Sequence, residues 1–263
     1  HYRATKKSNR TINKKDLFLC DSGGQYKYGT TDVTRTLCFS KQSNNIKNIY
    51  TKVLKGHIAV ASADLKKYEN GSKIDVLARK SLKKSGLDYS HGTGHGVGFF
   101  LNVHEGPQAI SKFNEVKIRE GMILSNEPGF YKEGWYGMRI ENLVFVKKNN
   151  NKIFFENLTL APLEKELINY KLLNKSEKDY IFFYHLDVYS KLSKYLNESG
   201  KYEFIKHNIQ SSSNQDGTQS DEINIGIKDE SKIIEIQGAG NGPIDAMIDA
   251  IKSDLKLDIK ISD

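Results

Sequence analysis

Four carboxylates and one imidazole are the residues of this sequence whose types and order suggest chemistry: Asp21, Asp32, His95, Glu127 and Glu141. Asp21 follows a short apolar run, and Asp32 opens an alternating run eleven residues later, across a glycine-rich segment. Both carboxylates can therefore project into one cavity. Glycines flank His95 and leave its ring unobstructed, while Glu127 ends an apolar run and Glu141 lies inside the next one.

Four carboxylates that converge on one dry pocket repel one another and cannot all stay ionised. Two divalent cations bring four positive charges and remove that objection. A donor set of oxygens with one imidazole suits Mn²⁺, and less specifically Co²⁺, Zn²⁺ or Fe²⁺. Two such ions about 3.5–4 Å apart can share a water, lower its pKa and polarise a substrate carbonyl. The five residues therefore predict a hydrolase site.

Each of these residues has a plainer interpretation when it is taken singly. An Asp before glycines is usually a turn former, a Glu in a strand usually faces solvent, and a His among glycines is more often structural than a ligand. Only the order of all five, with their surroundings, supports the functional prediction. The remaining histidines His57, His185 and His207 are expected to be surface or packing residues.

Five segments, DSGGQYKYGTTDVTRT, HGTGHGVG, NVHEGP, NEPGFY and RIENL, resemble the pita-bread metallopeptidases, the superfamily of methionine aminopeptidase, prolidase and aminopeptidase P. Within that superfamily the sequence is most similar to aminopeptidase P of the long cytosolic type. The resemblance runs from His1 to about Gln210 and implies an α+β pita-bread fold. The family's catalytic domain begins well before the matching His-Tyr, so we expect a catalytic domain that lacks its N-terminal part.

The resemblance also implies a role for each candidate ligand. Asp21 would chelate one metal, Asp32 and Glu141 would bridge both, and His95 and Glu127 would complete the second. Glu127 would also exchange a proton with the bridging water.

Further residues match positions that the family places around its substrate. His91 and His104 would contact the scissile carbonyl or the proline side of the substrate, and His1 would line the substrate pocket. Tyr131 and Arg139 would orient the ligand carboxylates. The implied reaction removes the first residue from peptides whose second residue is proline.

Composition limits the other classes of function. The chain has 263 residues, of which 38% are hydrophobic, a globular composition without the run of about 20 apolar residues that a membrane span needs. Its net charge of +8 comes from scattered lysines without an arginine stripe, which argues against nucleic-acid binding. Two cysteines with no CxxC motif indicate a cytoplasmic location. Proline-containing peptides are the expected partners, and the full-length protein is compatible with a homodimer.

Apolar periodicity predicts the secondary structure that carries these residues. Strands are expected over 17–20, 32–39, 122–125, 138–146 and 153–155, with Ser22-Gly23-Gly24 as a turn, and helices over 44–67, 74–85, 186–196 and 202–209.

A change in composition follows residue 210. The polar stretch 211–220 is expected to be a flexible linker that separates a catalytic domain at 1–210 from a small ββα unit at 221–263. That unit is expected to hold a hairpin, 223–227 with 233–236, and a helix at 244–252. Its phrase GNGPIDA resembles the regulatory domain of 2-isopropylmalate synthase, which binds leucine as a feedback inhibitor.

The leading hypothesis is a dinuclear X-Pro aminopeptidase. Three alternatives stay open: a prolidase that cleaves only X-Pro dipeptides, a catalytically silent pita-bread domain used for binding, and a leucine-sensing tail.

Overall fold

The computed structural model describes residues 5–100, 102–195, 202–213, 219–229, 232–240 and 243–255. The chain divides into two compact units, His1–Asn174 and Lys175–Asp263. Among the described helices, none has the length and apolar character that crossing a membrane requires.

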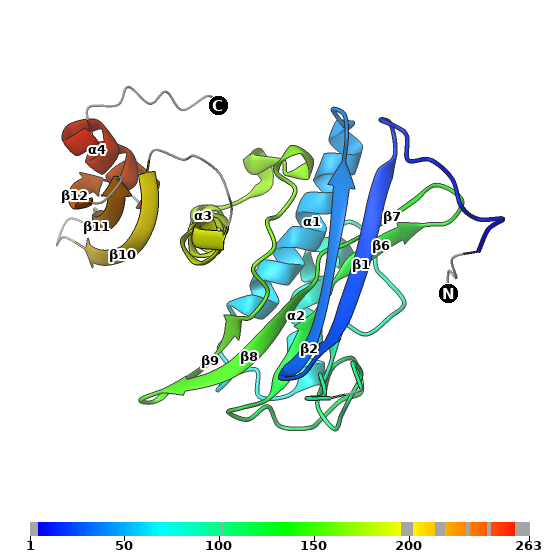
Figure 1. The fold of residues 1–263 in the computed structure, drawn as a ribbon. Coiled ribbons are helices and arrows are strands. Elements are labelled where there is room, and N and C mark those ends of the chain that lie inside the picture. Colours follow the sequence, from blue (N-terminus) through cyan, green and yellow to red (C-terminus); the bar gives the residue numbers. More distant parts are fainter. Residues whose placement is uncertain are drawn as a thin grey trace. The chain divides into compact units, whose positions relative to one another are not determined.

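The first unit opens with a long antiparallel hairpin followed by two helices (Figure 1). These elements are β1 (Leu17–Tyr26), β2 (Gly29–Cys38), α1 (Asn44–Ala61) and α2 (Gly71–Lys83). Shorter strands follow: β3 (Gly94–His95), β4 (Ala109–Ile110), β5 (Ile123–Asn126), β6 (Gly129–Lys132), β7 (Tyr136–Arg139), β8 (Asn142–Asn149) and β9 (Lys152–Asn157). Two 3₁₀ turns, Lys165–Leu167 and Tyr170–Leu172, end the unit.

Antiparallel pairs organise these strands into small sheets that are joined at single points. β5, β8 and β9 form one sheet, and β3 pairs with β4 and β6 with β7. An isolated bridge between Thr34 and Glu141 joins β2 to the chain just before β8, and a bridge between Gly96 and Leu124 joins the segment after β3 to β5. These two joints bring together the elements that carry the candidate ligands.

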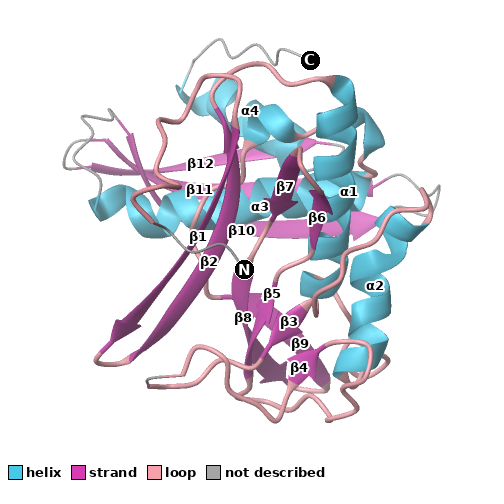
Figure 2. Ribbon diagram, turned by 90° about the vertical axis from the view of Figure 1, so that its right-hand side faces the viewer, coloured by secondary structure: helices cyan, strands magenta, loops and turns pink. Residues whose placement is uncertain are grey.

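Helices α1 and α2 lie side by side along one flank of the strands (Figure 2). Each begins at a capping side chain, because Ser43 and Asn70 accept hydrogen bonds from the first-turn amides of Ile46 and Lys73. Their apolar faces pack on the strands in one core. It contains Val60, Ile74, Ala78, Ile110, Leu124, Val144, Val146 and Phe155. The helices are therefore a rigid backing for the strands beneath them.

One polar residue of α1 lies inside the unit. His57 is 1% exposed, its Nδ1 lies 3.1 Å from the carbonyl oxygen of Asn126, and the Asn126 amide donates to the His57 carbonyl. Burial lowers the pKa of His57 to about 3, although hydrogen bonds to the backbone of Asn126 and Ile140 oppose the shift. His57 is therefore neutral in the folded protein and packs α1 against the strands.

Replacement of His57 by Gln should flatten the dependence of stability on pH. The ordinary histidine pKa of 6.5 lies above the folded value. Below pH 6.5, His57 therefore takes up a proton in the unfolded chain but not in the folded one. His57 thus lowers the free energy of unfolding as the pH falls from 6.5 toward about 3, with a limiting slope of about 1.4 kcal/mol per pH unit. Urea unfolding followed at the single tryptophan, Trp135 of the first unit, measures this slope.

The control is His185→Gln in the second unit, which should leave the slope at Trp135 unchanged. Equal slopes in the wild-type protein and in His57→Gln would contradict a neutral buried imidazole.

Two expectations for the first unit were wrong in detail. The segment Ser22–Gly24 is not a turn, because β1 continues through it to Tyr26 and Gly23 pairs with Asp32. A Cβ added at Gly24 would lie 2.8 Å from the exposed Tyr26 ring, which would have to shift. The run 138–146 is interrupted at residues 140–141, where the Ile140 amide donates to the Pro128 carbonyl and Glu141 bridges to β2.

The second unit combines two helices with a three-stranded antiparallel sheet. Its elements are α3 (Lys175–Leu192), a 3₁₀ turn (Ser193–Tyr195), β10 (Tyr202–Ser213), β11 (Gln219–Asp229), β12 (Lys232–Gly240) and α4 (Pro243–Leu255). The unit has a core of its own, formed by Leu186, Ile223, Ile225, Ile227, Ile236, Ala246 and Ala250. The expected hairpin and the C-terminal helix are confirmed.

Several expectations for this unit were wrong. The helix expected over 186–196 is the last part of α3, which begins at Lys175 and ends at Leu192. Residues 202–209 are strand β10 rather than a helix, because backbone pairing with β11 overrides a pattern that fits both structures. Residues 211–213 and 219–220, expected in a linker, extend the same strand pair. β10 lies at the edge of its sheet, and its last residues, 211–213, pair with β11 through the backbone although they carry no apolar side chain. The compact unit accordingly begins at Lys175, before the expected domain boundary.

Candidate metal centre

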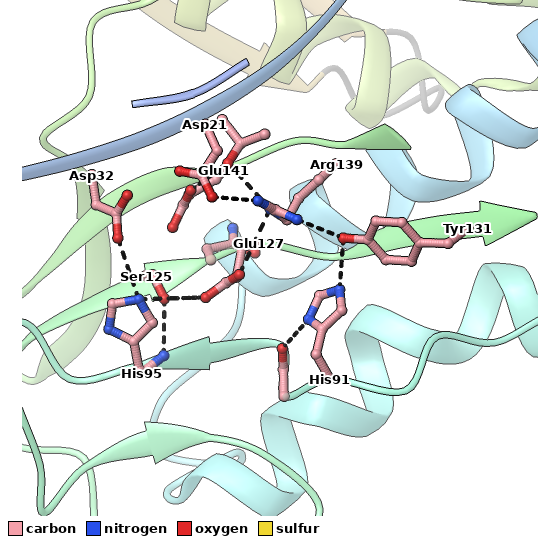
Figure 3. A network of polar contacts seen from close by, with 12 residues as sticks. Asp21, Asp32, His91, His95, Ser125, Glu127, Tyr131, Arg139 and Glu141 are labelled. Atoms are coloured by element: carbon pink, nitrogen blue, oxygen red, sulfur yellow. Dashed lines mark hydrogen bonds and ion pairs between the residues drawn. The ribbon is translucent and has the colours of Figure 1, made fainter. Parts of the chain in front are cut away.

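All five predicted ligands converge on one pocket of the first unit (Figure 3). Asp21 lies on β1, Asp32 on β2 and His95 on β3, while Glu127 follows β5 and Glu141 precedes β8. Three sets of residues have ligand atoms that all lie within 4.8 Å of one another: Asp21, Asp32 and Glu141; His95, Glu127 and Glu141; and Asp32, His95 and His104. Glu141 belongs to two of these sets and therefore lies between two groups of donors.

Strand geometry explains how the two aspartates come to share a face. Asp21 pairs directly with Thr34, and Thr34 lies two residues from Asp32 on β2. Residues two apart on a strand and residues directly opposite on its partner point to the same side. The hairpin therefore presents both carboxylates to the pocket.

Glycines allow His95 to reach the same pocket. A side chain at Gly94 would lie 1.9 Å from the Ser125 carbonyl oxygen, and one at Gly96 would lie 2.0 Å from the Glu105 carbonyl oxygen. Only glycine permits the backbone to pass this close to β5 at residue 94 and to the Glu105 segment at residue 96. The His95 amide then donates to Ser125 Oγ, and Ser125 Oγ donates to Glu127 Oε1.

The ring of His95 is oriented as a metal ligand requires. Its Nδ1 lies 2.9 Å from the Gly96 carbonyl, which can only accept, so Nδ1 carries the proton. Its Nε2 lies 3.4 Å from Asp32 Oδ2 and 3.5 Å from Glu127 Oε1. Burial lowers the pKa of His95, but Asp32, the Gly96 carbonyl and Glu127 outweigh burial and the pKa is raised. The two carboxylates thus favour positive charge at Nε2, which a proton supplies in the absence of metal and a divalent cation between the three groups could supply in its place.

The pKa values of the carboxylates also indicate that this site needs added positive charge. Glu141 is 2% exposed, and burial together with the charges of Glu127 and Asp32 raises its pKa to about 8. Burial raises the pKa of Glu127 as well. This pocket cannot hold all its negative charges without added positive charge. A donor set of carboxylate oxygens and one imidazole Nε2 fits divalent metal ions.

A chain of hydrogen bonds connects the ligands to His91 (Figure 3). Arg139 contacts Asp21 through Nη2 and donates to the Tyr131 hydroxyl through Nη1 at 2.7 Å. The Tyr131 hydroxyl lies 2.9 Å from His91 Nε2, and His91 Nδ1 donates to the Gly92 carbonyl. Burial lowers the pKa of His91, so its ring is neutral and accepts from Tyr131.

His104 and His1 complete the predicted set. The ring of His104 lies 4.0 Å from the ring of His95, edge to face, so it stands beside the candidate ligands. His1 lies outside the described residues.

Thr34 and Arg35 of β2 also serve the site, and sequence reasoning missed them. Thr34 Oγ1 donates to Glu141 Oε2 at 2.6 Å and accepts from Arg139 Nε. Arg35 is buried and donates to the Glu141 carbonyl at 2.6 Å and to the Asn142 side chain at 2.7 Å. The alternation of β2 places Thr34 on the face of Asp32 and could have revealed its role. Arg35 could not be found in this way, because hydrophobic periodicity does not predict that an arginine is buried.

Comparison with protein families adds an independent finding. A profile of metallopeptidase family M24 matches residues 1–148, more than half of the chain. This chain belongs to metallopeptidase family M24. The profile for the C-terminal region of that family matches residues 152–212, and the profile of the LeuA allosteric (dimerisation) domain matches residues 186–263.

Individual relatives of this M24 metallopeptidase agree with the assignment. A probable Xaa-Pro aminopeptidase P of Pyrenophora teres f. teres is 45% identical over 209 residues, which are 75% of this chain and 32% of that protein. The crystal structure of the X-prolyl aminopeptidase of Caenorhabditis elegans, described as a cytosolic enzyme with a di-nuclear active site, superposes with a TM-score of 0.69 at 39% identity, over 74% of this chain and 33% of that one.

Prolidase from Pyrococcus furiosus gives a TM-score of 0.51 at 31% identity, over 58% of this chain and 43% of that one. These neighbours confirm the expected α+β pita-bread fold. The chain spans about a third of the length of the aminopeptidase relatives.

Substitution of Glu141 by Gln should abolish stabilisation by metal while leaving the metal-free fold at least as stable. The change removes one of four repelling carboxylates, and the amide oxygen can still accept from Thr34. For the wild-type protein, Mn²⁺ at a hundredfold excess over Kd should add about 2.7 kcal/mol to the free energy of unfolding. Thermal melts with Mn²⁺ and with a chelator measure both effects.

The matched control is Glu156→Gln, an exposed glutamate of β9 paired with Lys147, which should keep the full metal shift. An undiminished shift in Glu141→Gln would exclude Glu141 as a ligand.

Proposed function

We propose that this chain carries the catalytic centre of a dinuclear X-Pro aminopeptidase, which hydrolyses the first peptide bond of peptides whose second residue is proline. The observation that carries the proposal is the position of Glu141 between two donor sets, one with Asp21 and Asp32 and the other with His95 and Glu127. Membership of family M24 and the names of the relatives support the same activity.

Asp21, Asp32, His95, Glu127 and Glu141 would hold two divalent ions, with Mn²⁺ as the best match and Co²⁺ or Zn²⁺ as alternatives. Such ions supply an activated water and polarise the scissile carbonyl. Glu127 lies at the pocket with Oε1 held by Ser125, so its carboxylate can take a proton from the attacking water and pass it toward the leaving nitrogen. Arg139 fixes Asp21 and thereby the geometry of the first donor set.

The histidines at the rim of the pocket would bind the substrate. His104 stands beside His95 and can face a peptide that enters the pocket. Both ring nitrogens of His91 are engaged, with Tyr131 and with the Gly92 carbonyl. Contact between His91 and a substrate carbonyl therefore requires the Tyr131 hydroxyl to change partners.

Specificity would follow from shape, because the tertiary amide of proline defeats general aminopeptidases. A cytoplasmic location, a role for His1 in the substrate pocket and a homodimer of the longer protein belong to the same proposal.

Hydrolysis of the tripeptide Arg-Pro-Pro tests the activity. The wild-type chain should release arginine in the presence of Mn²⁺ and not after chelation. Asp32→Ala should reduce the rate by at least about a hundredfold, because loss of a ligand costs no less than loss of a residue that orients one. Chromatographic detection of free arginine measures the rate.

Asp64→Ala, which removes an exposed aspartate of the α1–α2 connection, is the matched control and should retain activity. Cleavage of the dipeptide Arg-Pro alone would identify a prolidase instead. A metal-binding chain that cleaves neither peptide would be a silent binding module.

We propose a second function for the tail, which the match of residues 186–263 to the LeuA allosteric (dimerisation) domain favours. The tail would bind leucine as a regulatory ligand. Leucine at millimolar concentration should raise the melting temperature of the second unit, whereas D-leucine should not. A melting temperature that leucine leaves unchanged would contradict this function.

A further inference from the structure

A buried ion pair lies on α2, apart from the metal centre. Asp75 and Arg79 are spaced i, i+4 on the helix, with Arg79 Nε 2.7 Å from Asp75 Oδ2. They are only 3% and 9% exposed. Burial of a charged pair costs more desolvation than burial of apolar side chains of similar size, so packing of α2 alone does not account for it.

The remaining donors of Arg79 all reach the segment that leads to the site. Nη1 donates to Asp88 Oδ1 at 2.8 Å and to the Tyr89 carbonyl at 2.7 Å, and Nη2 donates to the His91 carbonyl at 2.7 Å. The guanidinium also lies over the ring of Tyr89, 4.0 Å from its centroid. One planar group therefore fixes the backbone on both sides of Ser90.

The other carboxylate oxygen of Asp75 makes a second set of contacts with the same segment. Asp75 Oδ1 accepts from the Thr93 hydroxyl, which also contacts the hydroxyl of Tyr89. The carbonyl of Thr93 in turn accepts from the Glu127 amide at 2.8 Å. The pair thus holds the segment from Asp88 to Thr93 at both ends, and one end contacts the backbone of a metal ligand.

His91 lies between the contacts made by Arg79 and the contact that Asp75 makes with Thr93. Its ring centroid lies 4.8 Å from that of Tyr89, with the planes tilted by 37°, and 5.4 Å from that of Tyr131, to which it is hydrogen-bonded. Because the carbonyl of His91 is fixed by Arg79, the direction of its side chain depends on the guanidinium. A lysine cannot supply the same forked set of donors.

We propose that Arg79, oriented by Asp75, is a positioning residue that aligns His91 for the substrate. It acts through the His91 carbonyl and contacts neither substrate nor metal. This inference rests on the proposed function, since it takes His91 as a group that meets the peptide.

Chemical rescue of Arg79→Ala tests the proposal. Arg79 lines an open cleft of about 710 Å³, so guanidinium can enter the space that the truncated side chain leaves. The variant should lose about tenfold to a hundredfold in kcat, the cost of a misplaced reacting group, with little change in KM. Millimolar guanidinium, far below denaturing concentrations, should restore much of the loss. Stabilisation by Mn²⁺ should remain.

Two further variants sharpen the experiment. Lys73→Ala breaks an exposed i, i+4 pair with Glu69 on the same helix and lines the same cleft, so it should show neither the loss nor the rescue. Arg79→Lys keeps a positive charge beside Asp75 and is the variant to use should the alanine variant not fold. It should stay impaired and resist rescue, because the ammonium fills the site without the fork.

The nuclear magnetic resonance signal of the His91 ring gives a readout that needs no activity. The signal, assigned by its absence in His91→Gln, should be single in the wild-type protein, broadened or doubled in Arg79→Ala, and single again with guanidinium. An unchanged signal and unchanged kcat in folded Arg79→Ala or Arg79→Lys would overturn the proposal. A wild-type chain that cleaves no X-Pro peptide would refute the proposed function, while the ring signal would still decide whether Arg79 positions His91.

Discussion

Mutual repulsion among buried carboxylates is the constraint on which this structure depends. Glu141 is almost fully buried beside Glu127 and Asp32, and its pKa of about 8 expresses how poorly the pocket tolerates another negative charge. Arg139 pairs with Asp21 and lies 3.9 Å from Glu127, but a single positive charge cannot offset four carboxylates. A fold that gathers these groups needs cations to complete it, and it must hold the groups rigidly enough that they cannot relax apart.

Rigidity comes from polar contacts at the seams between small sheets. The bridge from Thr34 to Glu141 is a single pair, yet the Thr34 hydroxyl and the Arg35 guanidinium tie the same glutamate by side chain and by backbone. A continuous sheet would need no such ties. Here the break between β7 and β8 turns Glu141 toward the hairpin, and buried polar side chains replace the missing ladder hydrogen bonds.

The sequence allowed the candidate ligands to be predicted, but not every residue that holds them in place. The candidate ligands could be singled out from the order of all five residues and the motifs around them, and the fold brings the five together. Ser22–Gly24 misled, because pairing with β2 carries the glycines through a strand where their residue type suggested a turn. Residues 202–209 misled because strand pairing with β11 decides their structure, and pairing is not local. Arg35 and Arg79 gave no signal at all, since charged residues in amphipathic patterns are expected at the surface.

Both helices hold the site through backbone carbonyls rather than through its functional side chains. His57 of α1 contacts the carbonyl of Asn126, the residue before Glu127, and Arg79 of α2 contacts the carbonyl of His91 itself. A contact to the carbonyl fixes where the side chain originates and leaves its own polar atoms available. This division of labour lets the core set where the functional side chains originate, while separate polar contacts orient the carboxylates and the rings.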